Sequence, residues 1–279
     1  FVSRFSHSEF ELYFEPNFIP VKIRAKRIVT TVHDFSFRLF PEAHPKDRIR
    51  YFEKNFFKNI RRSDRIITDS VYIKKEATEL FGLPDEIITP VHLGVDHDVF
   101  RIYQSAMLES CRRELGLPQK FILFVGTREP RKNLARLVEA YEELPDPVQR
   151  EFSLVLIGPR GWGEGDPTRA KNLGSRVVVL EYLDTKSLAL AYNLASVMVY
   201  PSLYEGFGLP PVEAMACGCP VVASNAASLP EVCGDAAIYV DPNDVRSIAE
   251  AMHRVLGDER LRTDLIERGL QRAKNFTWE

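Results

Sequence analysis

The sequence lacks several features that would place it in a specialised class of protein. No apolar run approaches the ~20 residues of a membrane-spanning helix. The first ten residues mix Arg4, His7 and Glu9, which does not fit a signal peptide. Lysine and arginine do not outnumber aspartate and glutamate, and the net charge is −2. A general nucleic-acid-binding protein would show a basic excess, so we expect no nucleic-acid partner.

Cysteine is scarce, and its spacing does not fit a metal or redox site. The chain has four cysteines, of which Cys217 and Cys219 are separated by one residue. Zinc and redox sites use the C-x-x-C spacing instead. We therefore predict that Cys111, Cys217, Cys219 and Cys233 are reduced and buried. Reduced thiols and the lack of a targeting segment predict a cytoplasmic location.

The composition is that of a soluble globular protein, and the pattern from Lys120 onward predicts an α/β domain. The chain has 279 residues, 45% apolar and 27% charged, which suggests two domains. Short apolar runs alternate with amphipathic segments, as in a parallel sheet covered by helices on both faces. The expected strands are 121–126, 153–158, 176–183, 196–202, 220–224 and 236–240, and the expected helices are 132–143, 185–194, 210–217 and 244–255.

The first hundred residues repeat this pattern less completely. We expect strands at 27–34 and 65–70, a helix over 47–60, and a second helix opened by Ser70 and closed by Gly82. Residues 84–118 contain three prolines and two glycines, which suits an interdomain connection. We therefore predict a partial N-terminal domain with its linker at 1–105 and a C-terminal domain at 106–279.

The stretch "YPSLYEGFGLPPVEAMACGCP" (200–220) places two carboxylates beside a predicted anion site. A strand ends at Tyr200 and a helix opens near two prolines, so free backbone amides lie at the carboxyl edge of a strand. Glu205 and Glu213 would repel a phosphate there unless each faces neutral hydroxyls. A ligand with hydroxyls on both sides of a phosphate group is a nucleotide diphosphate sugar.

A diphosphate also needs cations, and the turn after the first strand of the same domain supplies them. "GTREPRKN" (126–133) contains Arg128, Arg131 and Lys132. In parallel sheets ligands bind at the carboxyl ends of the strands. The alternative is a charged turn exposed to solvent.

These motifs resemble those of a known family. The E-x7-E spacing of Glu205 and Glu213, "EPRKN" (129–133), "TVHDFSFRLFPE" (31–42) and "HLGVD" (92–96) are similar to retaining GT-B glycosyltransferases of family four. The likeness covers nearly the whole chain. It implies an α/β fold with two Rossmann-like domains and parallel sheets, of which the N-terminal one is incomplete. We expect the chain to be truncated at both ends.

The resemblance also implies catalytic roles. Glu205 would face the hydroxyls of the donor sugar and the developing positive charge, and His33 would approach the sugar from the N-terminal domain. The reaction would move a hexose, with retention, onto a saccharide or a lipid-linked saccharide. A lipid-linked acceptor would be met at a membrane. The basic segment 48–65, with seven Lys or Arg residues, predicts either a solvated surface or peripheral contact with the inner face of the membrane.

Binding roles follow from the same resemblance. Glu213 would hold the ribose, and Arg128 and Lys132 would hold the diphosphate. Thr127 stands where the family places its phosphate-binding arginine, so Arg128 and Arg131 both remain candidates for that role. The backbone at Gly206, Phe207, Gly208 and Leu209 would also touch the donor.

The donor is predicted less closely than the reaction. The sequence looks most like bacterial mannosyltransferases of surface polysaccharide synthesis, so GDP-mannose is the first expectation. A UDP-glucose-type donor and a non-catalytic nucleotide-sugar-binding protein are the alternatives. Because Arg128 and Lys132 offset the diphosphate charge, we expect no metal and no other cofactor.

Three weaker motifs suggest other readings. Asp96-His97-Asp98 fits the D-x-D of metal-dependent transferases, but it lies in the connecting segment. "GWGEG" (161–165) is similar to a dinucleotide turn, yet it lacks the G-x-G-x-x-G spacing of a nicotinamide dehydrogenase. Tyr182 and Leu183 follow a strand and could pack either on a nucleotide base or in the core.

Overall fold

The computed structural model describes residues 10–161 and 176–279, and the chain divides into two compact units between His92 and Leu93. The sequence placed this boundary after residue 105. Residues 93–105 instead belong to the second unit because Val95 and Phe100 lie in its core and the amide of Tyr103 donates to Asn193.

The first unit contains a four-stranded parallel sheet in the order β1-β2-β3-β4. The two predicted strands are confirmed as β2 and β3. The edge strands β1 and β4 were not predicted, because β1 is mostly exposed and mixes polar with apolar residues, while β4 has three residues and ends in proline. The strands are β1 (Phe10–Glu15), β2 (Ala25–Val32), β3 (Arg65–Thr68) and β4 (Ile88–Pro90).

Helices α2 and α3 of the first unit begin and end close to the predicted residues. Phe52, Phe56 and Ile60 recur at helical spacing and are buried along α2. The hydroxyl of Ser70 caps α3 by accepting the amide of Ile73 at 3.2 Å. The helices of this unit are α1 (Ser36–Leu39), η2 (Pro41–Ala43), α2 (Lys46–Ile60), α3 (Val71–Glu79) and η3 (Asp85–Ile87).

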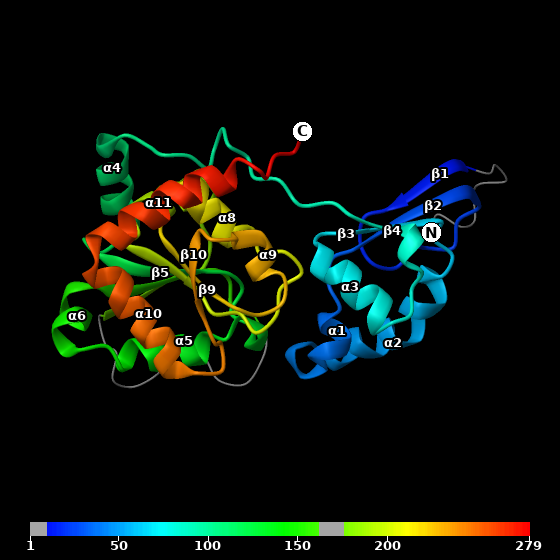
Figure 1. The fold of residues 1–279 in the computed structure, drawn as a ribbon, viewed down its shortest axis with the longest axis horizontal. Coiled ribbons are helices and arrows are strands. Elements are labelled where there is room, and N and C mark those ends of the chain that lie inside the picture. Colours follow the sequence, from blue (N-terminus) through cyan, green and yellow to red (C-terminus); the bar gives the residue numbers. More distant parts are fainter. Residues whose placement is uncertain (1–9, 162–175) are drawn as a thin grey trace. The chain divides into compact units, whose positions relative to one another are not determined.

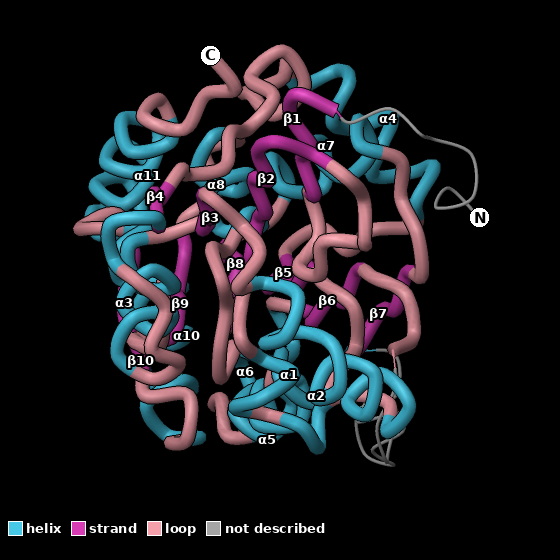
Figure 2. Tube along the Cα trace, turned by 90° about the vertical axis from the view of Figure 1, so that its right-hand side faces the viewer, coloured by secondary structure: helices cyan, strands magenta, loops and turns pink. Residues whose placement is uncertain are grey.

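The second unit contains a six-stranded parallel sheet in the order β10-β9-β8-β5-β6-β7. All six strands predicted from the apolar runs are confirmed. Figure 2 shows β5, β6 and β7 side by side. The strands are β5 (Phe121–Val125), β6 (Ser153–Ile157), β7 (Val177–Leu180), β8 (Val197–Tyr200), β9 (Val221–Ser224) and β10 (Ala237–Val240).

The strand order of this sheet reverses between β5 and β8. The chain runs from β5 outward to β7, and it then returns to place β8 on the other side of β5. Such a reversal is the point in an open parallel sheet where the loops at the carboxyl ends of two neighbouring strands diverge and leave room for a ligand.

The helices of the second unit surround its sheet (Figure 1). Helices α5 and α10 contact each other, α4, α7, α8 and α11 form a contiguous series, and α10 also contacts α11. The helices are η4 (Pro130–Lys132), α4 (Ser105–Leu115), α5 (Leu134–Glu142), α6 (Asp146–Glu151), α7 (Thr185–Leu194), α8 (Leu209–Ala216), α9 (Leu229–Cys233), α10 (Val245–Gly257) and α11 (Glu259–Ala273).

The cysteines behave as predicted: all four are buried and carry free thiols. Burial raises the pKa of Cys233, for example, to about 12, which keeps it a neutral core residue. Within residues 10–161 and 176–279, the structure has no helix with the length and apolar character needed to cross a membrane.

Candidate active site

The loops that follow β5 and β8 bring together three of the predicted site residues. The loop after β5 carries Arg131 and Lys132, and the loop after β8 carries Glu205. Nζ of Lys132 donates to Oε1 of Glu205 at 2.7 Å, and Nη1 of Arg131 donates to Oε2 at 3.1 Å. Each carboxylate oxygen of Glu205 therefore has its own cation.

This arrangement keeps Glu205 ionised although it is only 6% exposed. Burial by itself would raise the pKa of Glu205, but the charges of Lys132 and Arg131 outweigh burial and lower it to about 2. Burial likewise opposes the charge of Lys132, and the Glu205 carboxylate reverses that effect and raises the pKa of the ammonium. The hydroxyl of Tyr200 accepts a further hydrogen bond from Lys132 at 2.8 Å.

Arg131 makes contacts beyond Glu205. Its Nη1 also donates to the carbonyl of Tyr204 at 2.7 Å, and its Nη2 donates to Oε1 of Glu129 at 2.8 Å. The backbone carbonyl of Arg131 accepts the amide of Leu203 at 2.9 Å. Main-chain and side-chain atoms of one residue thus join the β5 loop to the β8 loop.

Arg128 lies on the other side of the same turn. Its amide donates to the carbonyl of Pro159, in the loop after β6, at 3.0 Å. Its Nη2 is 3.7 Å from Oε1 of Glu181, which follows β7. Gly158 permits this close approach of loops, because a Cβ there would lie 2.1 Å from the carbonyl oxygen of Gly126. Arg128 therefore faces the β6 and β7 loops.

Buried contacts hold the backbone of the loop after β8. The hydroxyl of Ser228 lies 2.9 Å from the carbonyl oxygen of Glu205 and 2.8 Å from that of Phe207. The Phe207 ring is buried and meets the ring of Phe276 edge-on at 5.5 Å. Gly208 has φ +108°, and a Cβ there would lie 2.6 Å from Leu229. The predicted donor-contact residues Phe207 and Gly208 thus lie in a loop whose backbone is held by buried contacts.

Glu213 lies on α8 and has a different environment from Glu205. Its Oε2 accepts the hydroxyl of Tyr192, on α7, at 3.0 Å. Burial raises the pKa of Glu213 to about 7, and the hydrogen bond from Tyr192 only partly opposes burial. One of the two predicted glutamates is therefore ionised at neutral pH, and the other is poised between its two forms.

His33 belongs to the first unit and follows β2. Its Nδ1 lies 2.8 Å from Oδ2 of Asp69, and its Nε2 lies 2.9 Å from the carbonyl oxygen of Pro16. Both partners only accept, so an imidazolium satisfies both. The hydrogen bond to Asp69 raises the pKa of His33, against the opposing effect of burial.

The weaker motifs have local structural contacts. Asp96 Oδ1 accepts the amide of Asp98 at 3.0 Å, and His97 Nε2 lies 3.1 Å from the carbonyl oxygen of Phe276. Among the residues that the structure describes, no three His, Cys, Asp or Glu side chains gather as a metal site would require. The "GWGEG" motif lies, apart from Gly161, outside the described residues. Tyr182 is 82% exposed, so it does not pack in the core.

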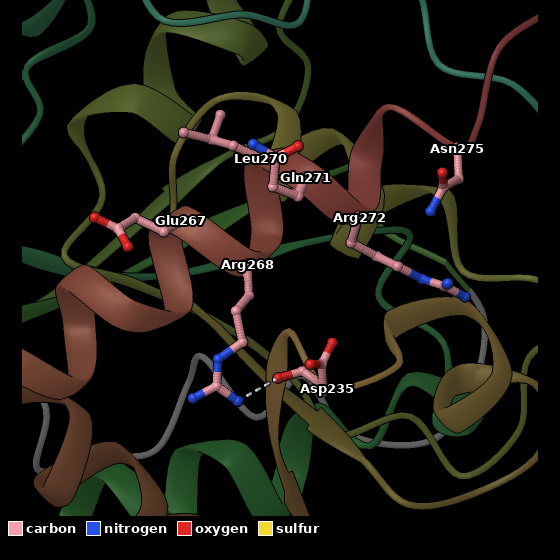
Figure 3. Close-up of a pocket in the computed structure, with 7 residues that line it drawn as sticks. All are labelled: Asp235, Glu267, Arg268, Leu270, Gln271, Arg272 and Asn275. Atoms are coloured by element: carbon pink, nitrogen blue, oxygen red, sulfur yellow. Dashed lines mark hydrogen bonds between the residues drawn. The ribbon is translucent and has the colours of Figure 1, made fainter.

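A pocket of about 580 Å³ lies elsewhere in the second unit, between α11 and the turn after α9 (Figure 3). Nη1 of Arg268 donates to the carbonyl of Asp235 across it at 3.1 Å. Arg272, at its rim, donates from Nε to the carbonyl of Val232 at 2.9 Å. Both arginines thus donate to backbone carbonyls at or just after the end of α9. None of the predicted site residues lines this pocket.

Three residues of the site were not singled out from the sequence. Glu129 and Tyr192 contact Arg131 and Glu213, respectively, as described above. Asn133 has φ 61°, and its Nδ2 donates to the carbonyls of Pro201 and Pro242, at 3.0 and 2.6 Å, in the loops after β8 and β10. An asparagine directly before a helix was the available signal for Asn133, because Asn tolerates this left-handed conformation.

Comparison with protein families gives two adjacent matches. Residues 109–272 match the model described as "Glycosyl transferases group 1". Residues 7–99 match the model described as "Glycosyltransferase Family 4". Together the two models cover both units of the chain.

Known proteins with similar sequences or folds agree with these matches. The chain is 40% identical over 271 residues to O-antigen chain mannosyltransferase B of Escherichia coli, covering 96% of this chain and 71% of that protein. It is 33% identical to the E. coli serotype-specific mannosyltransferase WbdA, covering 90% of this chain but 32% of that protein.

A solved structure shows the same architecture. Anabaena Alr3699/HepE in complex with UDP-glucose superimposes with a TM-score of 0.75 at 20% identity, covering 90% of this chain and 68% of that one. The expected α/β GT-B fold, with a smaller N-terminal sheet, is therefore confirmed.

Proposed function

The chain belongs to the group 1 glycosyl transferases, and we propose that it transfers mannose from GDP-mannose, with retention, to a saccharide or lipid-linked saccharide. The observation that carries this proposal is the cluster of Glu205, Lys132 and Arg131 at the point where the strand order reverses. The relatives named mannosyltransferases support the choice of sugar.

Glu205 would act on the donor sugar. Its pKa of about 2 keeps the carboxylate ionised at any physiological pH, so it accepts hydrogen bonds from sugar hydroxyls and stabilises positive charge that develops at the anomeric carbon. His33, whose raised pKa favours the imidazolium, would be a second catalytic residue. Glu213 would accept the ribose hydroxyls in its ionised form.

The cations would act on the leaving group. The bond between the anomeric carbon and the phosphate oxygen breaks, a bond to the acceptor oxygen forms on the same face, and the acceptor proton passes to the departing diphosphate. Lys132 has three N–H donors, of which Tyr200 and Glu205 take two, so the third can serve a phosphate oxygen. Arg128 would bind the diphosphate from the side of β6, and no metal is required for this role.

A transfer assay tests the reaction. The protein is incubated with GDP-mannose and with UDP-glucose, in chelator, together with mannose-terminated oligosaccharides that carry alkyl chains. We expect GDP release from GDP-mannose and a product whose new linkage has the anomeric configuration of the donor, as read by NMR. A product of inverted configuration, or release of UDP alone, would contradict the retaining mannosyl transfer and favour the alternatives.

Contact with a membrane through α2 is a separate part of the proposal. Arg48, Arg50, Lys54 and Lys58 are exposed along it, as is Tyr51. An anionic surface attracts such side chains by about 1 kcal/mol each. We expect the protein to sediment with vesicles that contain phosphatidylglycerol and to stay in solution with phosphatidylcholine vesicles. Equal sedimentation with the two kinds of vesicle would contradict an electrostatic contact and favour the alternative, in which this face of α2 is only solvated.

A further inference from the structure

Tyr182 is an exposed aromatic side chain at the edge of the sheet where the candidate site lies. It follows the last residue of β7 by two positions, so it stands at the carboxyl ends of the strands, as the loops after β5 and β8 do. At 82% exposure it is more exposed than any other large apolar side chain among the residues that the structure describes. Tyrosine offers a large and rigid apolar face, so a ring in this place is available to a ligand.

The backbone on both sides of Tyr182 is fixed. The carbonyl of Leu180 accepts the amide of Gly158 at 2.9 Å, which ties the end of β7 to the loop after β6. Leu183 packs against the core of the second unit. Asp184 caps α7 by accepting two amides of its first turn, at 3.1 and 3.0 Å. The ring of Tyr182 is therefore presented from an ordered turn, which lowers the entropy cost of binding a ligand on it.

The proposed ribose contact leads toward this turn. Glu213 would hold the ribose, and its Oε2 accepts the hydroxyl of Tyr192, on α7, at 3.0 Å. At 1.5 Å per residue, Tyr192 lies about 10 Å along α7 from the first residue of that helix. Side chains lean toward the N-terminus of their helix, so the hydroxyl of Tyr192, and Glu213 with it, lie closer to the first turn of α7. The turn with Tyr182 leads directly into that first turn.

The proposed diphosphate contact leads to the same turn from the other side. Oε1 of Glu181, the residue before Tyr182, is 3.7 Å from Nη2 of Arg128, which would bind the diphosphate. The turn 181–184 thus borders the places proposed for both the diphosphate and the ribose. The part of a nucleotide that has no proposed partner is its base, which is joined to the ribose and is flat and largely apolar on its faces.

We propose that the ring of Tyr182 is the surface on which the nucleobase of the donor stacks. This inference rests on the proposed function, because it assumes a nucleotide sugar with its ribose at Glu213. A base stacks on an aromatic side chain through its π-face, whatever its hydrogen-bonding edge. Guanine has two rings and uracil has one, so guanine covers more of the phenol ring and gains more from the contact. Tyr182 would therefore favour a guanine nucleotide over a uracil nucleotide.

Calorimetric titration with GDP, UDP and inorganic pyrophosphate tests the stacking contact. For Tyr182→Ala we expect the affinity for GDP to fall about tenfold, as when one stacked base loses its aromatic partner. The affinity for UDP should fall less, and that for pyrophosphate should stay within about twofold of wild type. Tyr182→Phe keeps the ring and should bind all three ligands as wild type does. Trp278→Ala removes another exposed aromatic side chain of the second unit and is the matched control.

Fluorescence of Tyr182→Trp gives a second readout, which a merely structural role of Tyr182 would not change. The new indole should keep the affinity for GDP, because it offers the base an aromatic face of at least the same size. Its emission should change on binding of GDP and stay constant with pyrophosphate, which has no base to stack. Wild type, with its own two tryptophans, gives the baseline for both ligands.

The outcomes distinguish this inference from the proposed function. Unchanged affinity for both nucleotides in Tyr182→Ala would overturn the stacking contact, and so would an equal loss of affinity for GDP and for pyrophosphate. Either result leaves the proposed function standing, because wild type still binds the nucleotide. If wild type binds UDP but not GDP, the proposed donor is wrong, and a loss of UDP affinity in Tyr182→Ala would still support stacking. If wild type binds no nucleotide, the proposed function fails and the inference fails with it.

Discussion

The two glutamates of the E-x7-E motif should respond to neutralisation with opposite changes in stability. The pKa of Glu213 is raised from 4.5 to about 7, mainly by burial. A group whose pKa is higher in the folded state stabilises the protein at low pH, and this stabilisation is lost as the pH rises from about 4.5 through about 7. At about 1.4 kcal/mol per pH unit, the loss is about 3 kcal/mol.

Replacing Glu213 with glutamine removes that loss. Glutamine keeps an oxygen that can accept the hydroxyl of Tyr192, and it has no charge to bury. We therefore expect Glu213→Gln to raise the free energy of unfolding by about 3 kcal/mol at pH 8 and by less than about 1 kcal/mol at pH 5. Urea unfolding followed by circular dichroism at the two pH values measures this difference, and exposed Glu250→Gln is the matched control.

Glu205→Gln should do the reverse. Its pKa of about 2 means that the ionised form stabilises the fold above about pH 4.5, and that this contribution is lost as the pH falls toward 2. Glutamine would leave Lys132 and Arg131 buried without their shared carboxylate, which costs about 3–5 kcal/mol. If Glu213→Gln has the same effect at pH 5 and pH 8, or if Glu205→Gln stabilises the protein at neutral pH, the reasoning about both environments is wrong.

Three further predictions follow from individual contacts. Tyr192→Phe removes the hydroxyl that donates to Glu213, so the pKa of Glu213 should rise above about 7. The pH midpoint of nucleotide binding should then move to higher pH. An unchanged midpoint would contradict this effect of Tyr192. Gly208→Ala places a Cβ 2.6 Å from Leu229 on a backbone with φ +108°, so it should lower the free energy of unfolding by about 3 kcal/mol. Gly257→Ala is the control, because nothing lies within 4 Å of its added Cβ, and it should not destabilise the protein. Similar melting temperatures for the two variants would contradict the expected strain at Gly208. Asp69→Asn removes the carboxylate that chiefly raises the pKa of His33, so an NMR titration should show a lower pKa for that imidazole. An unchanged pKa would show that Asp69 is not what raises it.

The fold could be predicted from the sequence where strands are buried on both faces. The runs that became β5 to β10 are short, rich in Val and Ile, and separated by amphipathic helices, so their pattern is unambiguous. Strand β1 alternates poorly and is exposed, and β4 is too short to show a period. The boundary at residue 92 was missed because the prolines and glycines of 84–118 indicate a connecting segment without showing which unit it packs on.

The residues of the candidate site could be predicted, but their partners could not. Strand-end position and charge identify Glu205, Lys132 and the arginines, since carboxyl ends of parallel strands share one edge. The pairing of cations with carboxylates depends on β8 lying next to β5 in the sheet. The order of the strands along the chain does not show that these two are neighbours. Glu129 therefore appeared only as one more charge in a turn, although its contact with Arg131 balances the cluster.

The most direct test of the central claim is calorimetric titration of this chain with GDP-mannose in the presence of a chelator. We predict saturable binding at one site, weakened at least tenfold in Glu213→Ala and unchanged in Glu250→Ala, because the ribose contact is worth at least one hydrogen bond to a charged group. Equal affinity in Glu213→Ala and wild type, or binding that appears only with manganese, would contradict a metal-free nucleotide-sugar site at the loops after β5 and β8.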